Sequence, residues 1–210
     1  MQFATLSPSQ QTGLTSRGGP TAATINLSQQ VNAAGLLTVN GMEFNWVQPL
    51  DFLLADSVGI EGLGLTANLT ILDQKSSGSA PAIATGVSPY QYNLTGYYDH
   101  NGVSVRVSYV FNDKTYNSGT NQQGICLPST ANPACPGGAY LYGAAYGQMD
   151  MSSSLRLSNL FGEIPTDPEV TFDVTNVTDS KLISYFNFPN ALHSYYNQGR
   201  TFMFGVRGTW

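Results

Sequence analysis

A two-residue alternation of apolar and polar side chains recurs along most of the chain. From residue 103 to 111 the odd positions are apolar, while Ser104, Arg106 and Ser108 between them are polar. A period of two predicts a β-strand with one apolar and one polar face. Similar runs occupy residues 42–46, 63–71, 92–98, 149–157, 170–175 and 201–210, with a weaker run near 23–31. The sequence therefore predicts about eight strands.

Charged side chains within these runs keep to one face. All of them alternate with apolar residues and so fall on the polar face: Glu43, Asp99, Arg106, Asp150, Arg156, Asp173 and Arg207. Lipid contact would enforce this separation, because an Arg or Lys facing the middle of a bilayer costs roughly 2–4 kcal/mol. Several runs also reach about ten residues, the length at which a tilted strand crosses a bilayer.

The composition agrees with a membrane β-barrel. Charged residues make up 10% of the chain, against roughly 25% in soluble domains. No stretch approaches the roughly 20 apolar residues of a membrane-spanning helix. The net charge of −5 argues against a nucleic-acid partner, which would call for a basic patch. Met1 opens no signal peptide, so we expect that an outer-membrane protein would be incomplete here or have a misplaced start.

The connections between the runs differ in length on the two sides of the expected sheet. If the C-terminus is periplasmic, three connections become extracellular and three become periplasmic. The extracellular ones are 74–87, 113–142 and 176–199; the periplasmic ones are 49–60, 99–102 and 159–167. The three longest thus fall on one side. We therefore expect an all-β, antiparallel transmembrane β-barrel portion of about 8–10 strands with long extracellular loops.

Two cysteines, Cys126 and Cys135, bracket a stretch with two prolines in the longest of these loops. We expect a disulfide that closes a small exposed loop in an oxidising compartment. Two unrelated free thiols are the alternative. Two cysteines without a neighbouring His make only half a metal site.

Aromatic residues gather in the last expected outer loop: Tyr185, Phe186, Phe188, Tyr195 and Tyr196. They are candidates for contact with a ligand, and packing against the barrel mouth is the alternative. His100 and His193 are isolated, and no Gly-x-Ser-x-Gly elbow occurs. We therefore expect no enzymatic activity, no cofactor and no metal site.

The chain end resembles the closing strands of TonB-dependent receptors. In that family an Asn-Leu-x-Asp element ends the penultimate strand, and a Gly-Arg-x-Phe strand with an aromatic terminus follows a loop. The matching residues are Asn176, Val177, Asp179, Gly199, Arg200, Phe202, Gly205, Val206 and Arg207. Trp210 stands where the family mostly has Phe. Gly41 and Glu43 resemble an upstream strand, so that the resemblance covers residues 22–210 and leaves 1–21 as an irregular lead.

The resemblance implies active uptake of a nutrient ligand, such as a siderophore or a carbohydrate, across the bacterial cell outer membrane. The partners would be outer-membrane lipid, an unknown small-molecule ligand, and TonB acting through a plug that this chain lacks. It also implies that the last strand, with Phe202, Phe204, Val206 and Trp210, is the insertion signal read by the barrel-assembly machinery.

Two other functions are compatible with parts of the pattern. A complete eight-stranded outer-membrane barrel could have a structural or adhesive role, and its strand 22–31 would pair with strand 200–210. A soluble ligand-binding barrel would need an apolar interior, which the charged face argues against. We favour a receptor fragment that alone neither transports ligand nor couples to TonB.

Overall fold

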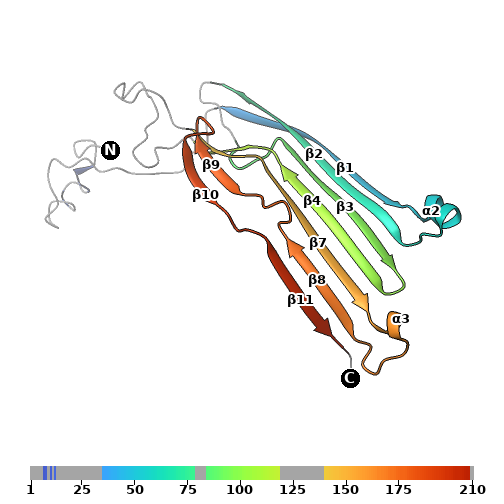
Figure 1. Cartoon of the computed structure of the whole chain (residues 1–210). Coiled ribbons are helices and arrows are strands. Elements are labelled where there is room, and N and C mark those ends of the chain that lie inside the picture. Colours follow the sequence, from blue (N-terminus) through green and yellow to red (C-terminus); the bar gives the residue numbers. More distant parts are fainter. Residues whose placement is uncertain are drawn as a thin grey trace.

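The protein is seen in a computed structural model that describes residues 35–78, 84–118 and 140–208, together with residues 7, 8, 10 and 12. Seven strands form one antiparallel sheet in the order β1-β2-β3-β4-β7-β8-β11 (Figure 1). Their bounds are β1 Leu36–Pro49, β2 Leu63–Ser77, β3 Tyr90–His100, β4 Val103–Asn112, β7 Tyr146–Arg156, β8 Glu169–Thr175 and β11 Thr201–Arg207. The expected all-β, antiparallel architecture is confirmed for the described residues.

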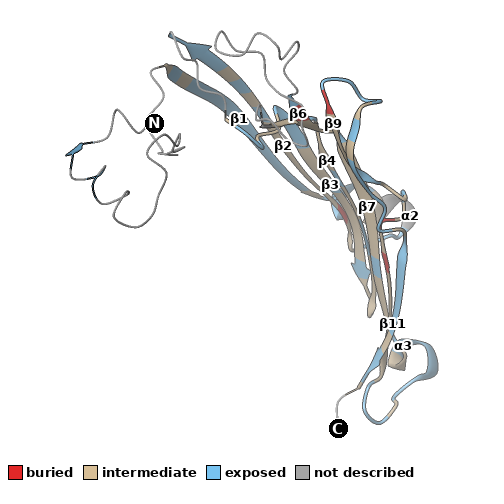
Figure 2. Cartoon of the chain, turned by 90° about the vertical axis from the view of Figure 1, so that its left-hand side faces the viewer, coloured by how far each residue is buried: buried red, intermediate tan, exposed pale blue. Residues whose placement is uncertain are grey.

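The sheet is a curved single layer (Figure 2). Among the described residues, the buried hydrophobic side chains are Leu141, Val174 and Phe186. A soluble domain instead buries the apolar face of its sheet against a second layer. Within the described part of the chain the sheet is also open, with β1 and β11 as its edges. The stability of this wall therefore comes mainly from strand pairing and from neighbouring side chains on each face.

Short connections and the C-terminus lie at one end of the sheet (Figure 1). Helix α2 (Asp51–Val58) joins β1 to β2, and helix α3 (Ser158–Phe161) follows β7. Between β3 and β4 a two-residue turn is formed by Asn101 and Gly102, with φ of 50° and 68°. Positive φ at both positions is what a type I′ hairpin requires, so the short connection predicted at 99–102 is a tight turn. The two helices are an addition to the expected short turns.

A second sheet occupies the opposite end, where the sequence predicted loops (Figure 1). It consists of β5 (Thr115–Ser118), β6 (Leu141–Gly143), β9 (Leu182–Phe186) and β10 (Leu192–Tyr196), in the order β10-β9-β6-β5. The prediction of irregular loops over these segments was wrong. After a break in the strand, β5 follows β4 and β9 follows β8, while β6 precedes β7 and β10 precedes β11. The order of the short strands therefore matches the order of the long strands that they extend.

Several sequence predictions lie outside the described residues. These concern Cys126 and Cys135, Trp210 and the weak strand near 23–31. The expected disulfide therefore stays a prediction, and so does the fragment interpretation, in which strand 22–31 and strand 200–210 remain unpaired with each other. The other seven predicted strands all appear, at 42–46 in β1 and at corresponding places in β2, β3, β4, β7, β8 and β11.

Candidate functional site

The register of the seven strands gathers the apolar side chains on one face. A central row runs across six strands through Leu65, Gly96, Val107, Met151, Val174 and Phe202. The next row toward the C-terminal end is Leu63, Tyr98, Val105, Ser153, Phe172 and Phe204. We call this surface the apolar face. The hydroxyl of Ser153 in the second row donates a hydrogen bond to the Phe172 carbonyl at 3.0 Å.

No second layer formed by the described residues covers the apolar face. Its members near the C-terminal edge are the most accessible, with Phe204 79% and Val206 76% exposed. On β1, at the opposite edge of the sheet, the side chains of Phe44 and Trp46 are 55% and 50% exposed. Contiguous exposed apolar patches larger than a few hundred Å² mark sites that contact membranes or other proteins. The exposed apolar face resembles such sites in this respect, and it extends to both edges of the sheet.

The length of the apolar face fits a bilayer. On β2 the apolar positions run from Leu63 to Ile71, a distance of roughly 26 Å along the strand at about 3.3 Å per residue. The next residue on the same side is Asp73, whose carboxylate is 3.2 Å from the ammonium of Lys75. This ion pair marks the end of the apolar band. An apolar band about 25 Å tall is typical of outer-membrane barrels.

The opposite face is mostly polar, with Val47 and Val110 among its apolar members. One row consists of Asn45, Asn68 and Asn93 on adjacent strands, and the next carries Thr66, Thr95, Ser108 and Asp150. All seven charged residues that the sequence placed on this side do lie on it in the observed register. The predicted segregation of charge is thus confirmed. We call this surface the polar face.

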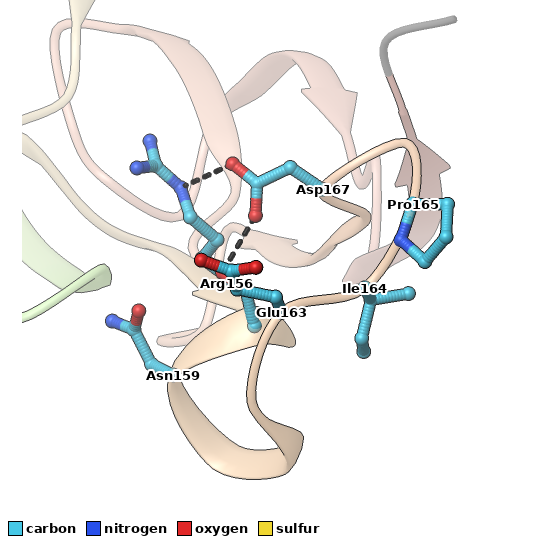
Figure 3. A pocket seen from close by; sticks show the side chains of 7 residues that line it. Arg156, Asn159, Glu163, Ile164, Pro165 and Asp167 are labelled. Atoms are coloured by element: carbon cyan, nitrogen blue, oxygen red, sulfur yellow. Dashed lines mark hydrogen bonds and ion pairs between the residues drawn. The ribbon is translucent and has the colours of Figure 1, made fainter.

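Two ion pairs lie on the polar face at the end of the sheet where β11 ends. Arg207 donates from Nε and Nη2 to Oε2 of Glu169, at 2.9 and 2.8 Å. In Figure 3, the carboxylate of Asp167 reaches the Nε atom of Arg156 at 3.5 Å, and it also accepts from the Ser158 hydroxyl at 2.6 Å. A cleft of about 550 Å³ lies beside this pair, between α3 and the loop that carries Pro165. Because the ion pairs are exposed, each contributes about 1 kcal/mol or less to stability.

Asn176 is fully buried and joins three segments of the chain. Its amide nitrogen donates to the carbonyls of Ser180 and Gly199, at 3.0 and 2.9 Å, and its Oδ1 accepts from the Ser180 backbone N–H at 2.8 Å. Its own backbone N–H donates to the carboxylate of Asp150 on β7 at 2.8 Å. Asn176 therefore fixes the break between β8 and β9 against the segment that leads into β11.

Other residues of the receptor-like motif meet at the same place. Arg200 donates from Nε to the Val177 carbonyl at 2.9 Å, and the backbone N–H of Asp179 donates to the carbonyl of Asn176. Asn176 and Asp179 have positive φ of 60° and 55°, a conformation that Asn and Asp adopt more readily than most residues. The resemblance singled out these residues from the sequence. The structure shows that they are hydrogen-bonded to one another.

The aromatic residues of the predicted outer loop do not form one surface. Phe186 is buried against Leu141, whereas Phe188, Tyr195 and Tyr196 are 66%, 52% and 60% exposed. Tyr185 stacks on Tyr142, with ring centroids 5.7 Å apart. The Phe186 side chain is therefore not exposed for such contact in this arrangement. The expectation of ligand contact stays a prediction.

One polar pair was missed by the sequence. The hydroxyl of Ser184 on β9 lies 2.9 Å from Nδ1 of His193 and 2.6 Å from the hydroxyl of Ser194. The His193 ring is edge-on to Phe186 at 5.0 Å. Ser184 and His193 are nine positions apart in the sequence and lie on neighbouring strands. No local sequence pattern predicts that they pair.

Within the described residues, no three or more His, Cys, Asp and Glu side chains cluster in a way that could hold a metal ion. No described helix is long and apolar enough to cross a membrane. Comparisons with protein-family models, with curated proteins and with solved structures found no match. The interpretation of the two faces therefore depends on their physical chemistry.

The first prediction compares neighbouring positions on β4. In lipid, Val107→Arg should lower the free energy of unfolding by about 2–4 kcal/mol, because the guanidinium would face hydrocarbon. Ser108→Arg is the matched control on the polar face and should cost less than about 1 kcal/mol. Urea titration of both variants refolded into phospholipid vesicles measures the difference. Equal effects at the two positions would contradict the assignment of the faces.

The second prediction concerns Asn176. Asn176→Ala should lower the free energy of unfolding by about 2 kcal/mol, because it leaves partly buried backbone groups of Ser180 and Gly199 without their bonds to this side chain. Asn176→Gly should be about 1 kcal/mol less damaging, since glycine adopts positive φ freely. Asn45→Ala, at an exposed site on the edge strand, is the control and should change stability by less than about 0.5 kcal/mol. Denaturant unfolding checks the order, and an Asn176→Ala variant as stable as the control would refute the role of this side chain.

Proposed function

We propose that this chain forms the C-terminal strands of a transmembrane β-barrel in the bacterial outer membrane, as part of a TonB-dependent receptor. The observation that carries the proposal is the two-faced, single-layered sheet. No second layer of the described chain covers its apolar face, and between the ends of the apolar band the strand charges lie on the opposite side; Asp73 and Lys75 lie just beyond that band. Lipid acyl chains are the partner that covers such a face without adding any polar contact.

The receptor-like motif supports the more specific part of the proposal. Asn176, Gly199 and Arg200 are separated in sequence, yet they share one hydrogen-bonded junction. Motif residues that are joined by hydrogen bonds support the resemblance more strongly than the same residues without contacts to one another. In the proposed receptor this junction holds the last strand in register beside β8.

The proposed activity is uptake of a nutrient. Ligand would enter from the side that carries the second sheet, and energy would arrive from TonB through a plug inside the full barrel. The polar face would then line the interior, where water and a plug require hydrogen-bonding side chains. A small complete barrel with a structural or adhesive role is the alternative function. It would share the two faces but would carry no ligand across the membrane.

The last strand has a further proposed partner, the barrel-assembly machinery. β11 is hydrogen-bonded to β8 on one side, and within the described chain its other side has no strand neighbour. A free strand edge pairs readily with a strand of another protein. Phe202, Phe204 and Val206 lie on the apolar face of this edge strand and are 59%, 79% and 76% exposed, so they are accessible for recognition.

The third prediction tests membrane assembly. The full chain, expressed behind a secretion signal in a Gram-negative host, should sediment with the outer membrane and resist extraction by alkaline carbonate. Phe204→Lys should reduce the assembled fraction at least several-fold, because it places a charge on the apolar face of the last strand.

Met203→Lys is the matched control, since Met203 lies beside Asp173 on the polar face. It should assemble as the unchanged chain does. Recovery of the unchanged chain in the soluble fraction would refute the membrane assignment. A second experiment places these strands in a receptor that has a plug and measures uptake with and without TonB. The receptor function predicts uptake that depends on TonB, and the adhesive barrel predicts no such uptake.

A further inference from the structure

Tyrosine rings form a continuous row across the second sheet. Tyr116 on β5, Tyr142 on β6 and Tyr185 on β9 are successive partners in the register. Their ring centroids are 5.8 and 5.7 Å apart, and Tyr140 lies 5.9 Å from Tyr116. The planes of Tyr142 and Tyr185 are inclined by only 24°, whereas Tyr116 is inclined by 68° to Tyr142, so that the row offers both ring faces and ring edges with hydroxyl groups.

Part of this row forms the wall of a cleft. The cleft measures about 360 Å³ and is lined by Tyr116 and Tyr142 on one side, and by Leu72, Val87 and Pro89 on the other. Two backbone bonds fix the far wall: Gly86 N–H donates to the Tyr116 carbonyl at 2.7 Å, and Leu72 N–H donates to the Pro89 carbonyl at 2.8 Å. The volume lies at the lower end of the range for small-molecule sites.

One polar atom in the cleft lacks a partner. Oε1 of Gln74, which lines the cleft, is buried and accepts no hydrogen bond from any described residue. A buried acceptor without a donor is unfavourable by about 1–3 kcal/mol. A ligand hydroxyl would satisfy it. The two charged side chains that line the cleft, Asp73 and Lys114, have opposite signs, and this balance favours an uncharged ligand.

We propose that this tyrosine cleft binds a neutral saccharide. The rings of Tyr116 and Tyr142 would contact the C–H face of a sugar ring, and Gln74 Oε1 would accept from one of its hydroxyls. This inference rests on the proposed function and names the ligand class for the same side of the barrel.

The tyrosine hydroxyls are suited to this role. Burial, reinforced by the neighbouring Tyr140 and Tyr142, raises the pKa of Tyr116 above its ordinary value. The hydroxyl therefore stays protonated at neutral and mildly alkaline pH, where it can donate as well as accept. A sugar hydroxyl, which also donates and accepts, is the complementary group.

Binding can be measured with maltose as the probe. The full chain, refolded in detergent micelles, should show saturable transfer of magnetisation to maltose by saturation-transfer difference NMR. Gln74→Met removes the acceptor at nearly constant volume and should weaken binding about three- to ten-fold, the value of one hydrogen bond. Tyr142→Leu should weaken it more, whereas Tyr142→Phe, which keeps the ring, should retain most of the affinity.

Gln91→Met is the control for the amide, because Gln91 lies on the polar face of β3 outside the cleft. It should bind maltose as the unchanged chain does. Absence of saturable binding by a folded chain, or equal binding by Tyr142→Leu, would overturn the saccharide site. A chain that assembles in the outer membrane without binding maltose refutes this inference alone, and a chain that binds maltose but stays soluble refutes the membrane proposal instead.

Discussion

Strand pairing in a single register is the constraint on which the rest of the structure depends. Because neighbouring strands are matched residue by residue, Val107 has apolar neighbours on both sides, and Ser108 has polar ones. A shift of one residue in any strand would move its apolar side chains to the polar face. The seven strands therefore stabilise one another only in this arrangement, and the arrangement leaves an apolar surface that the described residues do not cover.

The break between the two sheets depends on fewer contacts. β8 stops at Thr175, and the next residue, Asn176, turns the chain with positive φ while its amide bonds to Gly199, 23 residues later. The main sheet can thus end at a defined level, and the strands above it can form a separate sheet with its own tyrosine row. In the proposed receptor, this level separates the membrane wall from the ligand-facing mouth.

The alternation of side chains was enough to predict the main sheet. Runs such as 63–71 and 103–111 are long and regular, because their side chains point alternately to the apolar face and to the polar face. The second sheet was missed because its strands are short, as in Leu141–Gly143, and because Leu182–Phe186 does not alternate cleanly. The tyrosine cleft and the Asn176 junction could not be predicted either, since both join residues that are distant in sequence and depend on the strand order.

The central claim is that the apolar face contacts lipid. Spin labels placed singly at residues 103–111, in a chain with Cys126 and Cys135 changed to Ser, measure it directly after reconstitution in vesicles. If the apolar face contacts lipid, labels at 103, 105, 107, 109 and 111 should collide mainly with oxygen, which concentrates in lipid. Labels at the even positions should collide mainly with a water-soluble nickel complex. Accessibility without a two-residue period, or with the two sets exchanged, would contradict the account.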